Sequence, residues 1–161
     1  MKKIKLLTLC IIVKDGRILL GMKKRGFGEG RWNGFGGKVE PGETIAHAAH
    51  REVQEEVGIT VQKMDEVGVL MFEFESDPQK VMEVHVFKAE EYIGEATETE
   101  EMRPQWFDVN QIPYEQMWSD DAYWLPLLLQ GKKFTGTFLF DRPSDATYQA
   151  QILRQELKVQ S

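Results

Sequence analysis

The chain has 161 residues, of which 42% are hydrophobic and 29% are charged, and a mass of 18.6 kDa. These values are typical of a globular protein long enough to bury one continuous core, so we expect a single domain over residues 1–161. The net charge of −6 and the pI near 5.2 argue against binding to nucleic-acid polymers, because sequence-independent binding depends on many Lys and Arg contacts to phosphate.

The first predicted element is a β-strand over residues 4–14, although the N-terminus shares features with a secretory signal. Basic residues up to Lys5 precede an apolar run over 6–13. This run is short, contains Thr8, lacks a small-residue cleavage site and passes into a turn, so we interpret it as a strand. Cys10 is the single cysteine, which excludes an intrachain disulfide and favours a reducing compartment, the cytoplasm. We expect no association with a membrane.

Beyond this strand, turn signals and apolar alternation predict a chain of mixed strands with few helices. A turn at Asp15-Gly16 closes the first hairpin. The pattern indicates an α+β sandwich. In chain order, the elements after the turn are a strand over 17–23, a glycine-rich loop over 26–37, a helix over 44–57, strands over 61–74, 81–92 and 105–109, a short helix over 119–129, and a closing hairpin of strands over 134–142 and 146–157.

Residues 37–59 contain the most informative pattern, an acidic turn and helix of the form G-x5-E-x7-R-E-U-x-E-E-x-G-U, where U is aliphatic. At roughly 100° per residue, Glu52, Glu55 and Glu56 share one arc of the helix about 100° wide. Carboxylates three and four residues apart repel by about 0.2–0.5 kcal/mol per pair, so we expect a cation beside them. Hard oxygen ligands suit Mg²⁺ or Mn²⁺. The neighbouring arc, which we expect to face the core, contains Ala46, Ala49, Val53 and Val57.

Other interpretations of these segments compete with a metal site. Three glutamates on a helix, taken alone, are typical of a solvated face. The glycine-rich loop suggests phosphate binding, but it contains neither G-x-G-x-x-G nor a Walker sequence. We expect the loop to approach a ligand closely and to leave phosphate to the metal and to Lys23 or Lys38. His47 and His50 lack a matching third ligand and His85 lies in a predicted strand, so we expect no zinc site.

Every fixed position of the acidic pattern is filled, and with these residues the chain resembles the Nudix hydrolase family, whose defining motif this is. The resemblance implies an α-β-α sandwich with a mixed sheet and hydrolysis that depends on Mg²⁺, with Mn²⁺ as an alternative. It implies that Arg51 orients a helix carboxylate and that Glu56 serves as metal ligand and base. The implied catalytic residues are Arg51, Glu52 and Glu56, and the implied metal-binding residues are Gly37, Glu52, Glu55, Glu56 and Glu101.

Segments outside this motif are similar to one subgroup of the family, the animal-type diphosphatases of oxidised purine nucleoside triphosphates. The similarity is clearest over 20–28, 31–39, 84–87, 101–104 and 117–121. It implies hydrolysis of substrates such as 8-oxo-dGTP and 2-oxo-dATP to the monophosphate and pyrophosphate, which sanitises the nucleotide pool. The implied pocket has Asn33, Asp120 and Asp121 at the base edge, Phe27, Phe72, Phe74, Met82, Met102, Trp118 and Trp124 as walls, and Thr8 and Lys23 at the rim.

Asp120 and Asp121 are adjacent to each other and near tryptophans in the sequence. We therefore expect them to titrate as a coupled pair in which one carboxyl holds a proton at neutral pH. One carboxyl then donates a hydrogen bond while the other accepts one. Our hypothesis is that moving the proton between them lets one pocket accept either an oxidised guanine or an oxidised adenine.

The sequence leaves the choice of substrate open. Residues 76–80 form a loop one residue longer than the subgroup's usual one, and residues 146–151 have a sequence of their own. One alternative is a Nudix enzyme for another nucleotide, such as ADP-ribose or a dinucleotide polyphosphate. Another is a non-catalytic module that binds nucleotides or RNA, which the complete acidic set disfavours. We expect a monomer that acts on a small nucleotide.

Overall fold

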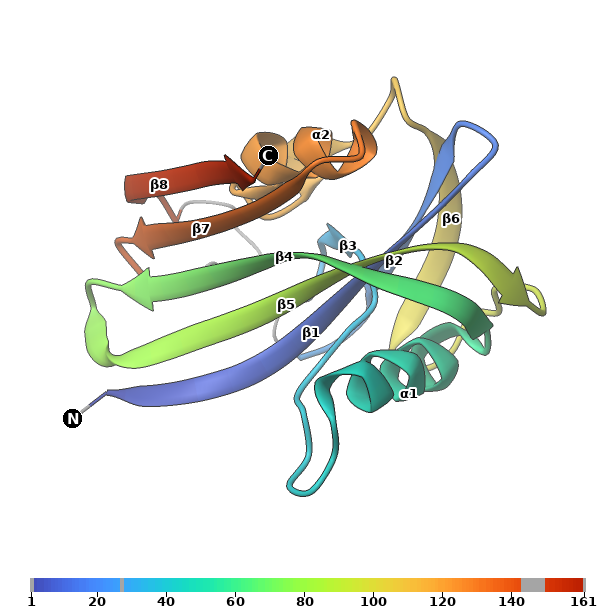
Figure 1. Cartoon of the computed structure of the whole chain (residues 1–161), viewed down its shortest axis with the longest axis horizontal. Coiled ribbons are helices and arrows are strands. Elements are labelled where there is room, and N and C mark those ends of the chain that lie inside the picture. Colours follow the sequence, from blue (N-terminus) through green and yellow to red (C-terminus); the bar gives the residue numbers. More distant parts are fainter. Residues whose placement is uncertain (1, 27, 143–149, 161) are drawn as a thin grey trace.

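The computed structural model describes residues 2–26, 28–142 and 150–160, and these form strands, two α-helices and one 3₁₀-helix (Figure 1). The elements are β1 (Lys3–Lys14), β2 (Arg17–Lys23), β3 (Trp32–Asn33), α1 (Ile45–Val57), β4 (Thr60–Phe74), β5 (Asp77–Ile93), β6 (Met102–Asp108), η1 (Tyr114–Gln116), α2 (Asp121–Leu129), β7 (Lys133–Phe140) and β8 (Ile152–Gln160).

The described strands belong to one mixed sheet of eight strands. Seven follow the order β3-β2-β1-β5-β4-β7-β8, and β6 pairs with β2. β1 runs parallel to β5 and β4 runs parallel to β7, whereas the other pairs are antiparallel. The sheet is therefore mixed, as predicted.

Successive residues of β1 contribute to two separate cores. Cys10 and Ile12 pack with Ala49 of α1, whereas Ile11 belongs to the cluster that contains Trp124 of α2. Neighbouring residues of a strand point to opposite faces of the sheet. The two α-helices therefore cover opposite faces (Figure 1), which confirms the predicted α-β-α sandwich.

Local signals account for the first hairpin and for both ends of α1. Asp15 and Gly16 have φ angles of 53° and 76°, the left-handed pair that a tight hairpin turn between β1 and β2 requires. The Thr44 side chain accepts a hydrogen bond from the N–H of His47 at 3.1 Å and caps the helix. Gly58 ends the helix at φ 75°, a left-handed conformation that favours glycine.

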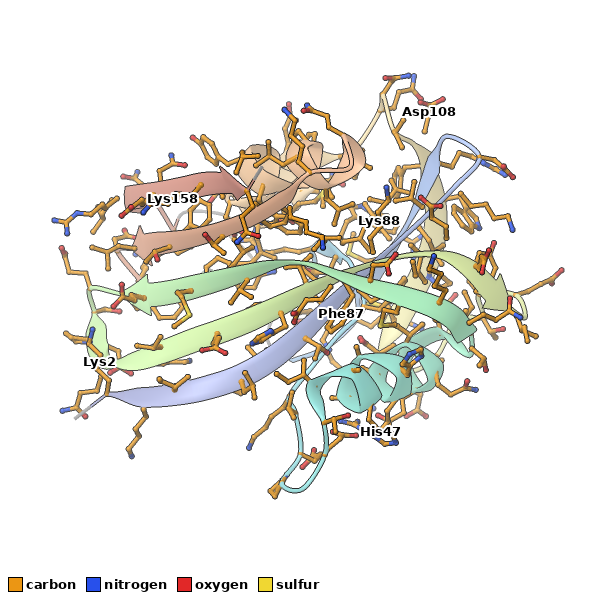
Figure 2. The ribbon with its side chains drawn as sticks, viewed as in Figure 1. Lys2, His47, Phe87, Lys88, Asp108 and Lys158 are labelled. Atoms are coloured by element: carbon orange, nitrogen blue, oxygen red, sulfur yellow. The ribbon has the colours of Figure 1, made fainter. Side chains whose placement is uncertain are left out.

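The buried side of α1 is rotated from the predicted one. Ala46 is exposed, whereas Ala48 is fully buried and Glu56 is only 4% exposed. The loop that leads into the helix passes beside Glu56, and the N–H of Gly36 donates to the Glu56 carboxylate. Loop packing thus shifts the buried arc toward the glutamates. His47 lies on the outer side of α1 (Figure 2).

Two short elements were missed, and two strands, β5 and β6, begin earlier than expected. β5 begins at Asp77 rather than at residue 81, so most of the loop expected over 76–80 belongs to this strand. β3 has two residues and η1 has three, which are too short to give a periodic signal. The strand expected over 105–109 is β6, which begins at Met102 and includes Pro104. In the part of the chain that the structure describes, β6 pairs with β2 alone, and an edge strand tolerates proline because no partner needs its N–H.

The closing hairpin consists of β7 and β8, but its boundaries differ from 134–142 and 146–157. β7 ends at Phe140, and β8 begins at Ile152 and continues to Gln160. The start of the second predicted strand, over 146–149, lies outside the described residues. Within the described ranges, neither α-helix is long and apolar enough to cross a membrane.

Candidate active site

A cavity of about 630 Å³ connects the acidic helix α1 with the aspartates at the start of α2. This volume is typical of a site for a small molecule. Residues of β1, β2, β4 and β5 form much of its wall. The residues predicted from the sequence that line it are Thr8, Lys23, Asn33, Gly37, Glu56, Phe72, Phe74, Met82, Glu101, Met102, Trp118, Asp120, Asp121 and Trp124.

Gly36 and Gly37 mark the closest approach between the loop backbone and α1. The N–H of Gly36 donates to Glu56 Oε1 at 2.8 Å. A Cβ atom at Gly37 would lie 2.6 Å from the carboxyl carbon of Glu52, and a Cβ at Gly36 would lie 1.8 Å from the carbonyl oxygen of Thr8. A side chain at either position would therefore displace backbone or carboxylate. The two glycines allow two carboxylates of α1 to lie against the backbone beside the cavity.

Arg51 holds the remaining carboxylates of the motif. Its Nε and Nη2 donate to Glu43 at 2.7 and 2.9 Å. Its Nη1 donates to Glu52 at 3.0 Å and to Glu55 at 3.2 Å, and its Nη2 also donates to the carbonyl of Lys38 at 3.1 Å. The hydrogen bonds from Arg51 are the largest cause that lowers the pKa of Glu43 to about 2. This geometry fits an arginine that orients carboxylates.

Glu56 and Glu52 are in the opposite electrostatic situation. Burial raises the pKa of Glu56 to about 8, although Lys23 and the N–H of Gly36 act against the shift. Burial also raises the pKa of Glu52; the hydrogen bond and the charge of Arg51 oppose this shift, and the charge of Glu55 adds to it. A cation beside either carboxylate would favour its ionised form.

The predicted metal-binding residues are brought to one end of the cavity without forming a closed set. Gly37, Glu56 and Glu101 line the cavity and Glu52 abuts Gly37, whereas the Glu55 side chain is 58% exposed and turned to Arg51. Among the described residues, no three His, Cys, Asp or Glu side chains converge closely enough to hold a metal ion. Mutual repulsion opposes a closer approach of the carboxylates, and Glu55 is bound by Arg51 instead. The carboxylate oxygens of Glu52 and Glu56, which are largely shielded from water, nevertheless fit a hard divalent cation.

The second acidic cluster lies deeper in the cavity, at the start of α2. Asp120 is 3% exposed and Asp121 is 7% exposed. The indole Nε1 of Trp124 donates to Asp120 Oδ2 at 2.7 Å. Burial raises the pKa of Asp120, and burial together with the neighbouring Asp120 charge raises the pKa of Asp121 well above its usual value. Both shifts favour the protonated form of the carboxyl groups, which is the direction expected for a buried coupled pair.

Apolar side chains surround these aspartates. Phe72 stacks on Phe138 with ring centroids 5.8 Å apart. The Asn33 side chain donates from Nδ2 to the carbonyl of Arg31 at 3.1 Å, which fixes its orientation in the wall. Of the predicted pocket residues, Phe27 lies outside the described part of the chain.

Several residues at the site were not singled out from the sequence. Lys5 lines the cavity together with Leu7, and the two-residue period of β1 would have identified both. Arg25 also lines it, and so does Lys38, which was expected from the sequence to help bind phosphate. Arg31 is 1% exposed behind the pocket, and no sequence signal distinguishes it from an ordinary loop arginine.

Comparisons with known proteins agree with this geometry. The profile of the NUDIX domain matches residues 5–128. The chain is 57% identical over 136 residues to an oxidized purine nucleoside triphosphate hydrolase of Danio rerio, covering 84% of this chain and 86% of that protein. It is 56% identical, with the same coverage of both chains, to the protein of that name from Mus musculus.

Solved structures show the same architecture. A MutT protein from Bacillus halodurans superimposes with a TM-score of 0.82 at 27% identity, covering 95% of this chain and 97% of that one. A MutT NUDIX hydrolase from Burkholderia pseudomallei has a TM-score of 0.62 at 28% identity, covering 70% of this chain and 88% of that one. The likeness to the first structure thus extends over nearly the whole chain.

Proposed function

The chain belongs to the Nudix family, and from this membership we propose that it hydrolyses oxidised purine nucleoside triphosphates to the monophosphate and pyrophosphate, which sanitises the nucleotide pool. The observation that carries the proposal is a single cavity lined by the buried carboxylate of Glu56 at one end and by the buried Asp120–Asp121 pair at the other. The names of the similar zebrafish and mouse proteins support it. The triphosphate of the substrate would lie at the end with the glutamates, and the oxidised base would lie at the end with the aspartates.

Nudix hydrolases generally use divalent metal ions, and we propose Mg²⁺ here, with Mn²⁺ as the alternative. Glu52, Glu56 and the carbonyl of Gly37 would hold it, with Glu55 and Glu101 as outer partners. When bound, the metal neutralises phosphate charge and lowers the pKa of water. Such a cation would convert Glu56, which lies beside the cavity and binds a proton readily, into a base for the attacking water.

Although the protein has a net charge of −6, basic side chains at the cavity wall would bind the phosphates of the substrate. Lys5, Lys23, Arg25 and Lys38 all line the same cavity as Glu56. Lys23 is also 3.6 Å from Glu101, so phosphate would compete with a carboxylate for its ammonium group. Local positive charge of this kind attracts an anionic substrate even when the whole protein is acidic.

The aspartate pair would read the base. With one proton on the pair, one carboxyl donates a hydrogen bond and the other accepts one, while Asn33 contacts the same base edge. The apolar walls exclude water, so each hydrogen bond to the base contributes more to the discrimination between substrates. We further propose that residues 1–161 act as one monomeric domain in the cytoplasm.

A substrate panel with Mg²⁺ tests the proposal. We expect 8-oxo-dGTP and 2-oxo-dATP to have higher kcat/KM values than dGTP and ADP-ribose and to release stoichiometric pyrophosphate, and the same panel ranks methylated purine triphosphates against them. Faster turnover of ADP-ribose would assign the chain to another Nudix substrate. Orthophosphate as the direct product would exclude cleavage between the α and β phosphates. Tight binding without any product would indicate a non-catalytic module.

A further inference from the structure

Thr99 lies between β5 and β6, and its hydroxyl group contacts two residues that carry acidic side chains at the cavity. Its Oγ1 donates a hydrogen bond to the backbone carbonyl of Glu56 at 2.9 Å. The same oxygen accepts a hydrogen bond from the backbone N–H of Glu101 at 3.3 Å. A hydroxyl has one hydrogen to donate and lone pairs that accept, so it can make both contacts at once. Thr99 therefore joins the backbones of two residues that line the cavity.

The contact with Glu56 is made at the last turn of α1. Carbonyl groups in the last turn of a helix lack partners within the helix. The segment before β6 supplies partners for two of them, because the N–H of Thr97 donates to the carbonyl of Val57 at 2.9 Å and the Thr99 hydroxyl donates to that of Glu56. The Glu56 carboxylate also accepts a hydrogen bond from the N–H of Gly36. Both the backbone and the side chain of Glu56 are thus held.

Contacts with the end of β2 hold the other partner of Thr99. The N–H of Lys24 donates to the carbonyl of Glu101 at 2.9 Å, and Lys24 Nζ donates to the carbonyl of Thr99 at 2.9 Å. The N–H of Thr99 donates to the carbonyl of Met102 at 2.9 Å, where β6 begins. Residues 99–102 therefore form a hydrogen-bonded turn that is anchored to the sheet on one side and to α1 on the other.

A fixed separation between Glu56 and Glu101 matters for a metal ion in the cavity. Mg²⁺ requires near-ideal octahedral geometry and keeps several of its waters. A carboxylate that binds the ion, such as Glu56, and one that binds its waters, such as Glu101, must therefore stay at a defined distance from each other. Groups that orient metal ligands from behind change the affinity for the metal although they do not touch it. The Thr99 hydroxyl occupies such a position between the two backbones.

We infer that Thr99 is a positioning residue whose hydroxyl fixes Glu56 relative to Glu101 and so increases the affinity of the cavity for a divalent cation. Thr99 acts through the backbones of the two glutamates and is not itself a metal ligand, because its hydroxyl hydrogen is donated to Glu56. This role rests on the metal site that is part of the proposed function. It does not depend on which base the pocket accepts.

Mn²⁺ binding to the full-length protein without nucleotide tests this role. Thr99→Val removes the hydroxyl and keeps the shape of the side chain, whereas Thr99→Ser keeps the hydroxyl. The electron paramagnetic resonance signal of free Mn²⁺ measures the dissociation constant of each variant. Thr99→Val should weaken binding by about 10- to 100-fold, the range typical for loss of a group that orients a metal ligand. Thr99→Ser should bind Mn²⁺ as tightly as the wild type.

A matched control makes the same substitution two residues earlier in the chain. The Thr97 hydroxyl donates to the carbonyl of Glu95 at 3.1 Å, a contact that involves neither Glu56 nor Glu101. Thr97→Val should therefore bind Mn²⁺ like the wild type. If Thr99→Val does not fold, as judged by circular dichroism, Thr99→Ala removes the same hydroxyl with a smaller side chain.

Three results of the binding experiment would overturn the role of Thr99. Wild-type affinity in the folded variant without the Thr99 hydroxyl would show that the hydroxyl does not position the carboxylates. Equal weakening in Thr97→Val would indicate a general loss of order in the segment. A loss in Thr99→Ser as large as that in Thr99→Val would assign the effect to the methyl group.

The dependence of turnover on Mg²⁺ provides the second readout. In Thr99→Val the Mg²⁺ concentration for half-maximal turnover should rise by the factor by which Mn²⁺ binding weakens, while kcat at saturating Mg²⁺ stays close to wild type. A lower kcat with an unchanged Mg²⁺ requirement would contradict the role of Thr99. A wild type that binds Mn²⁺ but hydrolyses no oxidised purine would contradict the proposed substrate and leave the binding result intact. A wild type that binds no Mn²⁺ would overturn the role of Thr99 together with the metal site.

Discussion

Both acidic clusters of the cavity consist of buried carboxylates, but the two clusters differ in how the negative charge of those carboxylates can be compensated. Glu52 and Glu56 lie against glycine backbone at one end, while Asp120 and Asp121 lie among tryptophans at the other. Burial raises the pKa in both clusters. The first cluster adjoins the charged part of the cavity and can take up a cation. Burial of the second cluster favours the protonated form of its carboxyl groups.

This difference assigns the clusters separate tasks. The carboxylates of α1, which would bind a cation, act on the phosphates, and every nucleotide substrate has these phosphates. Carboxylates that share a proton act on the base, which differs between substrates. Changes at α1 should therefore alter the rate for all substrates, and changes at the start of α2 should alter the choice among them.

Metal removal should have the largest effect and should involve the α1 cluster. Chelation with EDTA is expected to abolish turnover of every substrate, because without the metal the attacking water is not acidified and the phosphate charge is not fully neutralised. The measurement is pyrophosphate release before chelation, after it, and after Mg²⁺ is restored. Undiminished turnover in EDTA would contradict the role given to these carboxylates.

Glu56→Gln should come next in size. The change keeps the shape of the side chain but removes its charge and its ability to accept a proton, so kcat should fall by about 10²–10⁴ for both oxidised purines while the ratio between them stays constant. The control is Glu90→Gln, since the Glu90 side chain is 65% exposed on β5. Normal kcat at saturating Mg²⁺ in Glu56→Gln would move the base to another carboxylate.

Asp120→Asn and Asp121→Asn should instead separate the two bases. An amide cannot exchange a proton, and a buried hydrogen bond left unmatched costs about 1–3 kcal/mol, or roughly five- to 150-fold in kcat/KM. We expect 8-oxo-dGTP and 2-oxo-dATP to lose unequal factors, measured across mildly acidic to mildly basic pH. Equal factors at every pH would make the pair structural.

Stability should show the smallest effect. The pKa of Asp121 is raised well above its usual value by burial, so the folded protein keeps a proton that the unfolded chain releases above about pH 4. The stability that this proton contributes is present at low pH and is lost as the pH rises toward the folded-state value. Asp121→Asn avoids that loss, so its melting temperature relative to wild type should increase from pH 5 to pH 8 by a few degrees, on the order seen for about 1 kcal/mol. A constant difference would show that the carboxyl is not protonated in the fold.

Local sequence signals were sufficient to predict the first hairpin turn and both ends of α1. The Asp15-Gly16 turn, the Thr44 cap and the Gly58 terminus each depend on neighbours within a few residues, and the structure has all three. The acidic motif placed its glutamates on one arc of α1 for the same reason. The exact ends of β6 and β8 depend on sheet pairing, and the sequence does not contain that information locally.

The features that depend on long-range packing were not predictable. Glu56 is buried because Gly36, twenty residues earlier, donates to it, and Arg31 is buried because it reaches Met117 across 86 residues of sequence. Helical periodicity cannot report either contact. The arrangement of Glu55 toward Arg51 is also a result of charge balance in three dimensions.

The most direct test of the contrast between the clusters is carbon-13 NMR titration of the Glu56 and Asp121 carboxyls with and without Mg²⁺. Without metal both should titrate well above the usual carboxylate range, with Glu56 near its pKa of about 8. With Mg²⁺ the pKa of Glu56 should fall below neutral pH, whereas that of Asp121 should stay raised. Equal shifts at both residues, or a Glu56 titration that Mg²⁺ leaves unchanged, would contradict the division between a cation site and a proton site.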